Sequence, residues 1–155
     1  MEQLIKGKTE HGKWYVRPVS WAGVWNEKQE LVSGNTLYET DNEKDCNSYM
    51  MNYKLLELVK ENPSLTIVPM THYEVCGGDN GYWMGEIQTV EIREYAINEW
   101  CVEEAVLFRD DIGAEDRLIE AIAEYKYDGT EEDYNKAEIE AKEMWTKAII
   151  IRIGI

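Results

Sequence analysis

The sequence is poor in the residues that most often form covalent cross-links or carry out catalysis. Its 155 residues include three cysteines, Cys46, Cys76 and Cys101, an odd number without a CxxC pair, so we expect reduced thiols in a cytosolic protein. There are only two histidines, His11 and His72, and no H-E-x-x-H, G-x-S-x-G, Walker A or G-x-G-x-x-G motif. We therefore expect that the protein is not an enzyme and binds no cofactor or metal.

Long apolar segments are also missing. No apolar run approaches the ~20 residues that a membrane-spanning helix needs. Residues 1–14, MEQLIKGKTEHGKW, lack the apolar core of a secretory signal peptide. We expect a cytoplasmic protein that has no membrane partner.

Phenylalanine is nearly absent, whereas tyrosine and tryptophan are frequent. The chain has one Phe against ten Tyr and six Trp. Tyr and Trp combine an apolar ring with a polar group, and they favour half-solvated places such as interfaces and pockets. A small core with tyrosines at its edge would use the same composition, so both interpretations stay open.

Positive charge is scarce. Asp and Glu number 31 against 16 Lys and Arg, which gives a net charge of −15. Such a protein repels nucleic acids and anionic membranes, and its natural partners are basic surfaces or cations. The charge is uneven, because residues 98–145 hold sixteen acidic against five basic side chains, a net of −11 in under a third of the chain.

The order of predicted elements indicates a single α+β domain over residues 1–155, with a mostly antiparallel sheet and about three helices packed on it. Residues 13–25, with Pro18 inside, are typical of an edge strand or an interrupted one. Gly34-Asn35 predicts a hairpin over 31–39. Thr40-Asp41-Asn42-Glu43 predicts a capping box for a helix that stops at Pro63.

The rest of the chain is predicted as strands followed by two helices and a last strand. The run KAIIIRIGI, 147–155, is typical of a strand buried on both faces, so we place it at the centre of the sheet. Gly129 is expected to stop the first of these two helices and Thr130 to cap the second. The predicted segments are strands 64–75, 82–97 and 100–108, a turn at 77–81, and helices 113–126 and 131–146.

The two last helices differ in how they place their acidic residues. The helix 131–146 is patterned for stability, because Glu132–Lys136, Glu138–Lys142 and Glu143–Lys147 are i,i+4 pairs with Glu first. Each such pair stabilises a helix by ~0.3–0.5 kcal/mol. Its acidic residues therefore have a structural explanation.

The helix 113–126 has no such explanation. Asp116, Glu120 and Glu124 recur every four residues, roughly 6 Å apart along the axis, with no Lys or Arg four residues later. Each like-charged neighbour pair costs ~0.2–0.5 kcal/mol. A charged stripe is often only a solvated face, but neighbouring tyrosines, among them Tyr134, would suit an arginine-rich partner. The predicted partner-binding residues are Asp110, Asp111, Glu115, Asp116, Glu120, Glu124, Tyr125 and Tyr127.

These features favour a non-enzymatic inhibitor that covers a basic, nucleic-acid-binding surface of another protein with an acidic helical face. A stripe of carboxylates can compete for Lys and Arg that would otherwise hold phosphates. In general character, small acidic chains of this kind resemble the phage-encoded inhibitors of bacterial defence, namely anti-CRISPR and anti-restriction proteins. That resemblance implies a DNA mimic acting in the host cytoplasm on a protein of a defence system.

Two other hypotheses remain. The loop VCGGDNGYW, 75–83, has glycines that could hold an anion and rings that could stack on a base, which suits a nucleotide-sequestering module, expected to be oligomeric. A weaker one is a metal-dependent enzyme centred on Asp110 and Asp111. The residues of the ligand-binding alternative are Gly77, Gly78, Tyr82, Trp83, Arg93 and Arg109.

Overall fold

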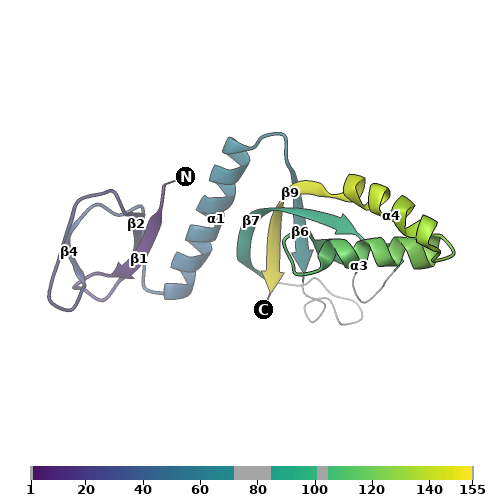
Figure 1. The fold of residues 1–155 in the computed structure, drawn as a ribbon. Helices are drawn as coiled ribbons and strands as arrows, with labels where there is room; N and C mark the ends of the chain where they lie inside the picture. The colour runs from purple at the N-terminus through teal and green to yellow at the C-terminus, as the bar shows by residue number, and fades with distance from the viewer. Residues whose placement is uncertain (1, 72–84, 101–104, 155) are drawn as a thin grey trace. The chain divides into compact units, whose positions relative to one another are not determined.

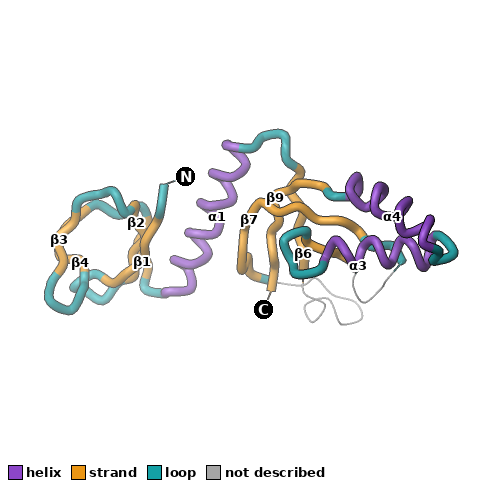
Figure 2. The backbone as a smooth tube through the Cα atoms, in the orientation of Figure 1, coloured by secondary structure: helices purple, strands orange, loops and turns teal. Residues whose placement is uncertain are grey.

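The structure, a computed structural model, describes residues 2–71, 85–100 and 105–154 (Figures 1 and 2). Helices and strands are both present, with strands in three sheets, and the α+β class predicted from the sequence is confirmed. The chain divides into two compact units, one of Met1–Pro63, Pro69–Val90 and Ile151–Ile155 and one of Ser64–Val68 and Glu91–Ile150. Each is described by itself, and the single domain predicted for 1–155 stays a prediction.

The first unit contains a three-stranded antiparallel sheet in the order β1-β2-β5, a two-stranded antiparallel ribbon β3-β4 and a long helix. Of the two alternatives predicted for 13–25, the interrupted strand is confirmed, because the chain leaves the first sheet after Pro18 and enters the ribbon at Gly23. The edge strand is wrong, because β2 is the middle strand of its sheet. The elements are β1 (Leu4–Lys8), β2 (Trp14–Pro18), β3 (Gly23–Trp25), β4 (Leu31–Gly34), β5 (Tyr38–Thr40) and α1 (Glu43–Glu61).

The hairpin predicted over 31–39 is wrong. β4 pairs with β3 and β5 pairs with β2, so the Gly34-Asn35 segment connects two different sheets. Leu37 N donates to Val16 O over 2.8 Å, which fixes this connection to the first sheet before β5 begins. Pairing with strands earlier in the chain therefore outweighs the local turn signal.

The N-cap of helix α1 lies two residues later than the predicted cap, Thr40. Asn42 is the N-cap, and its side chain accepts a hydrogen bond from Lys44 N over 3.0 Å. Thr40 instead accepts from Asn42 N over 3.2 Å and donates to Asp45 Oδ2 over 3.1 Å. The predicted end is confirmed, since the helix stops at Glu61 just before Pro63.

A four-stranded sheet has the order β6-β9-β7-β8. The last strand, β9, is interior in this sheet, and its residues Ala148 to Ile151 are all buried. The predicted central position of the C-terminal strand is confirmed, and its continuous apolar run reflects burial on both faces. The bounds are β6 (Thr66–Thr71), β7 (Glu86–Ile97), β8 (Val106–Phe108) and β9 (Thr146–Gly154).

The helices of the second unit are α3 (Ala114–Ala121), the π-helical turn η1 (Ile122–Lys126) and α4 (Glu131–Met144). α4 begins at the predicted cap Thr130, and Gly129 has a φ of 71° as expected for a helix stop. No helix in the described part of the chain is both long and apolar enough to cross a membrane. The core of this unit consists of Ala96, Leu107, Ala114, Leu118, Ile122, Ala123, Ala137 and Ala141.

The turn η1 changes which side chains face this core. A regular helix over 113–126 would place Tyr125 on the same face as Leu118 and Ile122. Instead Tyr125 is 66% exposed, while Tyr127 packs against the core cluster. A π-helical turn holds more residues than an α-helical one, so it rotates the following side chains around the axis.

Candidate functional site

Three carboxylates of α3 and η1 form one candidate site, which we call the acidic face: Asp116, Glu120 and Glu124. All three are exposed, and none forms an ion pair with a cation in the described part of the chain. The nearest cation in sequence, Arg117, points elsewhere, since its Nη1 donates to Ile112 O over 2.7 Å. The like-charged stripe predicted from the sequence is therefore present on the surface without a local counter-charge.

Two tyrosines accompany the acidic face. The pKa of Tyr134 on α4 is raised, first by burial and then by the negative charges of Glu124 and Glu120, so its phenol lies close to both carboxylates. Tyr125 follows Glu124 directly and is exposed. Tyr127 differs, because it packs against the core and its hydroxyl donates to Glu140 Oε2 over 3.1 Å. The aromatic part of the face is therefore Tyr125 and Tyr134.

Asp110 and Asp111 are engaged with Arg93. Arg93 Nε donates to Asp110 Oδ1 over 2.9 Å, and its Nη2 donates to Asp111 Oδ1 over 2.7 Å. The guanidinium carbon lies 4.0 Å from the centre of the Phe108 ring. Burial lowers the pKa of Arg93, but the hydrogen bonds and charges of the two aspartates raise it overall. Arg93, predicted to bind a small ligand, is therefore bonded to two aspartates that were predicted to bind a protein partner.

Helix α4 pairs its acidic side chains with its own lysines. Glu132–Lys136 and Glu138–Lys142 form ion pairs of 3.1 Å and 2.7 Å. The third predicted pair, Glu143–Lys147, is not a helical i,i+4 pair, because α4 ends at Met144 and Lys147 belongs to β9.

Two electrostatic interactions link α4 to α3 and η1. The charge of Glu115, which is half-buried, contributes to the raised pKa of Lys142 after the hydrogen bond and the charge of Glu138. Glu140 binds Lys126 of η1. Glu115 therefore faces α4 and does not extend the exposed stripe.

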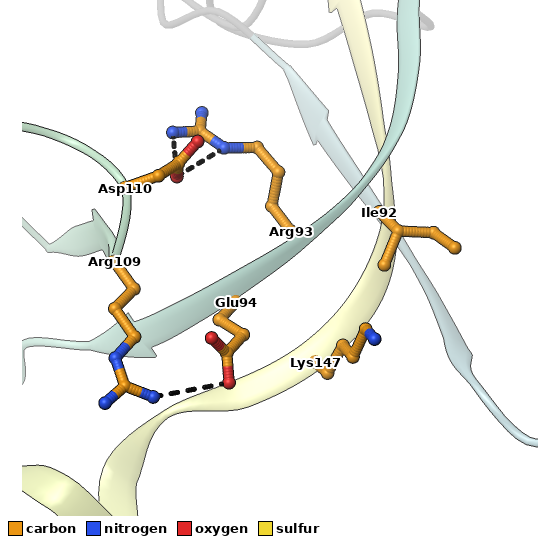
Figure 3. Close-up of a pocket in the computed structure, with 6 residues that line it drawn as sticks. All are labelled: Ile92, Arg93, Glu94, Arg109, Asp110 and Lys147. Carbon is orange, nitrogen blue, oxygen red and sulfur yellow. Dashed lines mark hydrogen bonds and ion pairs between the residues drawn. The ribbon is translucent and has the colours of Figure 1, made fainter.

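A pocket of about 440 Å³ is the second candidate site (Figure 3). Arg93 and Arg109, predicted as ligand-binding residues, both line it. The other four predicted residues of that site, Gly77, Gly78, Tyr82 and Trp83, lie outside the described residues. The lining side chains are Ile92, Arg93 and Glu94 of β7, Arg109 and Asp110 after β8, and Lys147 of β9.

The register of β7 and β8 explains the charges of the pocket. Tyr95 lies opposite Phe108, and extending this antiparallel register places Glu94 opposite Arg109 and Arg93 opposite Asp110. Arg109 N donates to Glu94 O over 3.0 Å, which continues the ladder by one residue. Each cation therefore meets an anion across the strands.

The sequence analysis missed Glu94 and Lys147. Glu94 could have been found, because Arg93-Glu94 and Arg109-Asp110 carry complementary charges when they are read in opposite directions. Lys147 offers no such signal, because its place depends on β9 lying in the same sheet.

Metal binding finds no support at Asp110 and Asp111. Within residues 2–71, 85–100 and 105–154, no group of three or more His, Cys, Asp or Glu side chains could hold a metal ion. The two aspartates instead accept hydrogen bonds from Arg93.

Comparisons of the chain with protein-family models, with curated proteins and with solved structures find no match. The function proposed below therefore rests on the residues described above.

Proposed function

We propose that the protein is a non-enzymatic inhibitor that binds a basic, nucleic-acid-binding surface of another protein through the acidic face. The observation that supports this function is the contrast between neighbouring helices. α4 pairs Glu132 and Glu138 with lysines, whereas Asp116, Glu120 and Glu124 are exposed and have no ion-pair partner among the described residues. Like charges at this spacing destabilise a helix, so a bound cationic partner would relieve the repulsion.

The chemistry of the face suits arginine and lysine. Carboxylates accept charge-assisted hydrogen bonds from guanidinium groups, often in pairs. Tyr125 and Tyr134 offer ring faces beside these carboxylates, where a guanidinium also gains a cation–π contact. The net charge of −11 over residues 98–145 would draw a basic partner to this part of the chain and speed association.

Such an inhibitor would act as a DNA mimic. Lysines and arginines that hold phosphates would instead be occupied by the acidic face, and nucleic acid would be excluded by competition. In general character the chain resembles phage-encoded anti-CRISPR and anti-restriction proteins, and the partner would then be a defence protein in the host cytoplasm.

The test is a capture experiment followed by competition. The tagged wild-type protein is incubated with bacterial lysate, beside a variant that carries Asp116→Asn, Glu120→Gln and Glu124→Gln. We expect the wild type to retain a nucleic-acid-binding protein that the variant loses, and retention to weaken at higher salt. The purified partner should then release labelled DNA when the wild type is added, and should not when the variant is added.

A matched control separates the acidic face from overall charge. The variant Glu132→Gln, Glu138→Gln, Glu143→Gln changes the net charge by the same amount but lies on α4. It should retain the partner as the wild type does. Equal loss in both triple variants would mean that net charge alone is responsible, and retention by the first variant would contradict the acidic face as the binding surface.

A further inference from the structure

We propose that the pocket between β7, the end of β8 and β9 is a binding site for a small anion that carries a phosphate or carboxylate group, with Lys147 and Arg109 as its ligands. This site is separate from the acidic face and does not depend on the inhibitor function. Its volume, about 440 Å³, lies within the usual range for small-molecule sites. One cationic side chain of the pocket is left over once the cross-strand pairs are formed.

Arg93 is a fixed part of the pocket wall. Its side chain is only 10% exposed, both aspartates bind it, and the Phe108 ring packs against it. Its single positive charge is more than offset by these two carboxylates, and Glu91 Oε1 lies 4.0 Å from its Nη1. Arg93 shapes the pocket but has little free capacity for a ligand.

Arg109 is held much more loosely. Its Nη1 lies 3.4 Å from Glu94 Oε1, which is long for a charge-assisted hydrogen bond. A guanidinium has five N–H donors, so most of them stay available. The backbone hydrogen bond between Arg109 N and Glu94 O keeps the two residues side by side. Figure 3 shows their side chains facing each other at the pocket.

Lys147 is the cation of the pocket lining that has no acidic ion-pair partner among the described residues. It is exposed, lines the pocket from β9, and forms no ion pair with any residue that the structure describes. Among the described lining residues, Asp110 binds Arg93 and Glu94 contacts Arg109. Lys147 is the lining cation left without an acid, and a ligand anion would pair with it.

Ile92 favours a ligand that has an apolar portion in addition to its anionic group. It is the apolar member of the lining, so the ligand would place a small organic portion against it. Figure 3 shows the Glu94 carboxylate between Arg109 and Lys147, so a phosphate or carboxylate that contacts both cations would displace Glu94 from Arg109. A phosphate monoester and a polycarboxylate share this chemistry, and the experiment distinguishes them.

Binding is measured by titration calorimetry of the full chain with inorganic phosphate, a nucleoside monophosphate and citrate, each at constant ionic strength against chloride. We expect saturable binding of at least one of these anions, and the one that binds most tightly identifies the ligand class. Lys147→Gln should weaken it by about tenfold, which corresponds to ~1.4 kcal/mol. Arg109→Gln should also weaken it. Glu94→Gln should tighten it, because a competing carboxylate is removed.

Two controls keep the inference testable. Lys142→Gln removes a cation on α4 outside the pocket and should leave anion binding unchanged. The triple variant of the acidic face should also bind the anion as the wild type does, so that failure here and failure of the inhibitor function are distinguishable. The site would be overturned by no saturable binding, by equal weakening in Lys142→Gln, or by weaker binding in Glu94→Gln. Circular dichroism confirms that each variant is folded.

Discussion

Arg93 Nη2 lies 2.7 Å from Asp111 Oδ1, and the same guanidinium binds Asp110. One guanidinium thus holds two carboxylates that could each have served a partner. The Arg93 side chain is 10% exposed, whereas those of Asp110 and Asp111 are 69% and 50% exposed. Both aspartates are engaged with Arg93, and the acidic face as defined above consists of the three carboxylates on α3 and η1.

The first prediction concerns this ion pair. Asp110→Asn with Asp111→Asn should lower the free energy of unfolding by about 1–3 kcal/mol, because Arg93 is largely buried and would lose both charged acceptors. Partner binding should be preserved. Urea unfolding and capture of the partner measure the two effects, with Asp128→Asn, an exposed acid elsewhere, as the control. A double variant as stable as wild type would show that the pair contributes nothing.

The second prediction is that the acidic face reduces stability. Glu120→Lys replaces repulsion with attraction toward Asp116 and Glu124, so the melting temperature should rise by about 2–4 °C while partner binding falls. Glu132→Lys on α4 should instead lower the melting temperature, because it removes the ion pair between Glu132 and Lys136 and places a second cation beside Lys136. Thermal unfolding compares the two variants. A lower melting temperature for Glu120→Lys would mean that the stripe does not repel itself.

The third prediction separates two tyrosines that are close in sequence. Tyr125→Ala should leave stability within about 0.5 kcal/mol of the wild type but weaken partner binding, because the ring is exposed beside Glu124. Tyr127→Ala should lower stability by about 3 kcal/mol, because its ring packs against the core and its hydroxyl binds Glu140. Chemical denaturation and partner capture, carried out on both variants, test the contrast. Equal destabilisation would contradict the rotation caused by η1.

The fourth prediction concerns pH and the N-terminus of α4. Thr130 and Asp133 form a capping box, and the hydrogen bond from Thr130 is the main reason that the pKa of Asp133 lies below its ordinary 3.8. A carboxyl whose pKa is depressed by folding contributes stability above its unfolded pKa, and this contribution is lost as pH falls through the folded pKa.

Thr130→Ala should therefore cost about 1 kcal/mol at pH 7. The difference from wild type should shrink below about pH 4, as Asp133 is protonated in both proteins. Urea unfolding at pH 7 and pH 3 measures the difference. A cost that is independent of pH would mean that Asp133 has no part in the cap.

The sequence predicted best where local chemistry and burial point in the same direction. Thr130 followed by acidic residues marks a cap on local grounds, and the apolar run of β9 requires burial on both faces wherever the sheet lies. The hairpin predicted over 31–39 is wrong because β4 pairs with β3 and β5 pairs with β2, both earlier in the chain. Gly34 therefore ends a strand of one sheet and does not turn back into a hairpin.

Part of the candidate site could also be predicted. The exposed stripe of Asp116, Glu120 and Glu124 follows from helical spacing alone. The packing of Tyr127 against the core does not, because a π-helical turn leaves no clear sign in the amino-acid pattern. The charged pocket required knowledge of strand register, and Lys147 required the sheet order as well.

The interior position of β9 has a consequence for how the protein forms. During synthesis β6, β7 and β8 emerge before residues 146–154 are made, yet β9 is the neighbour of both β6 and β7. Contacts between segments so distant in the chain are slow to form, because a long loop must close first. Until then β6 and β7 expose open edges that can pair with another chain. The growing polypeptide is therefore most vulnerable to aggregation just before β9 is made.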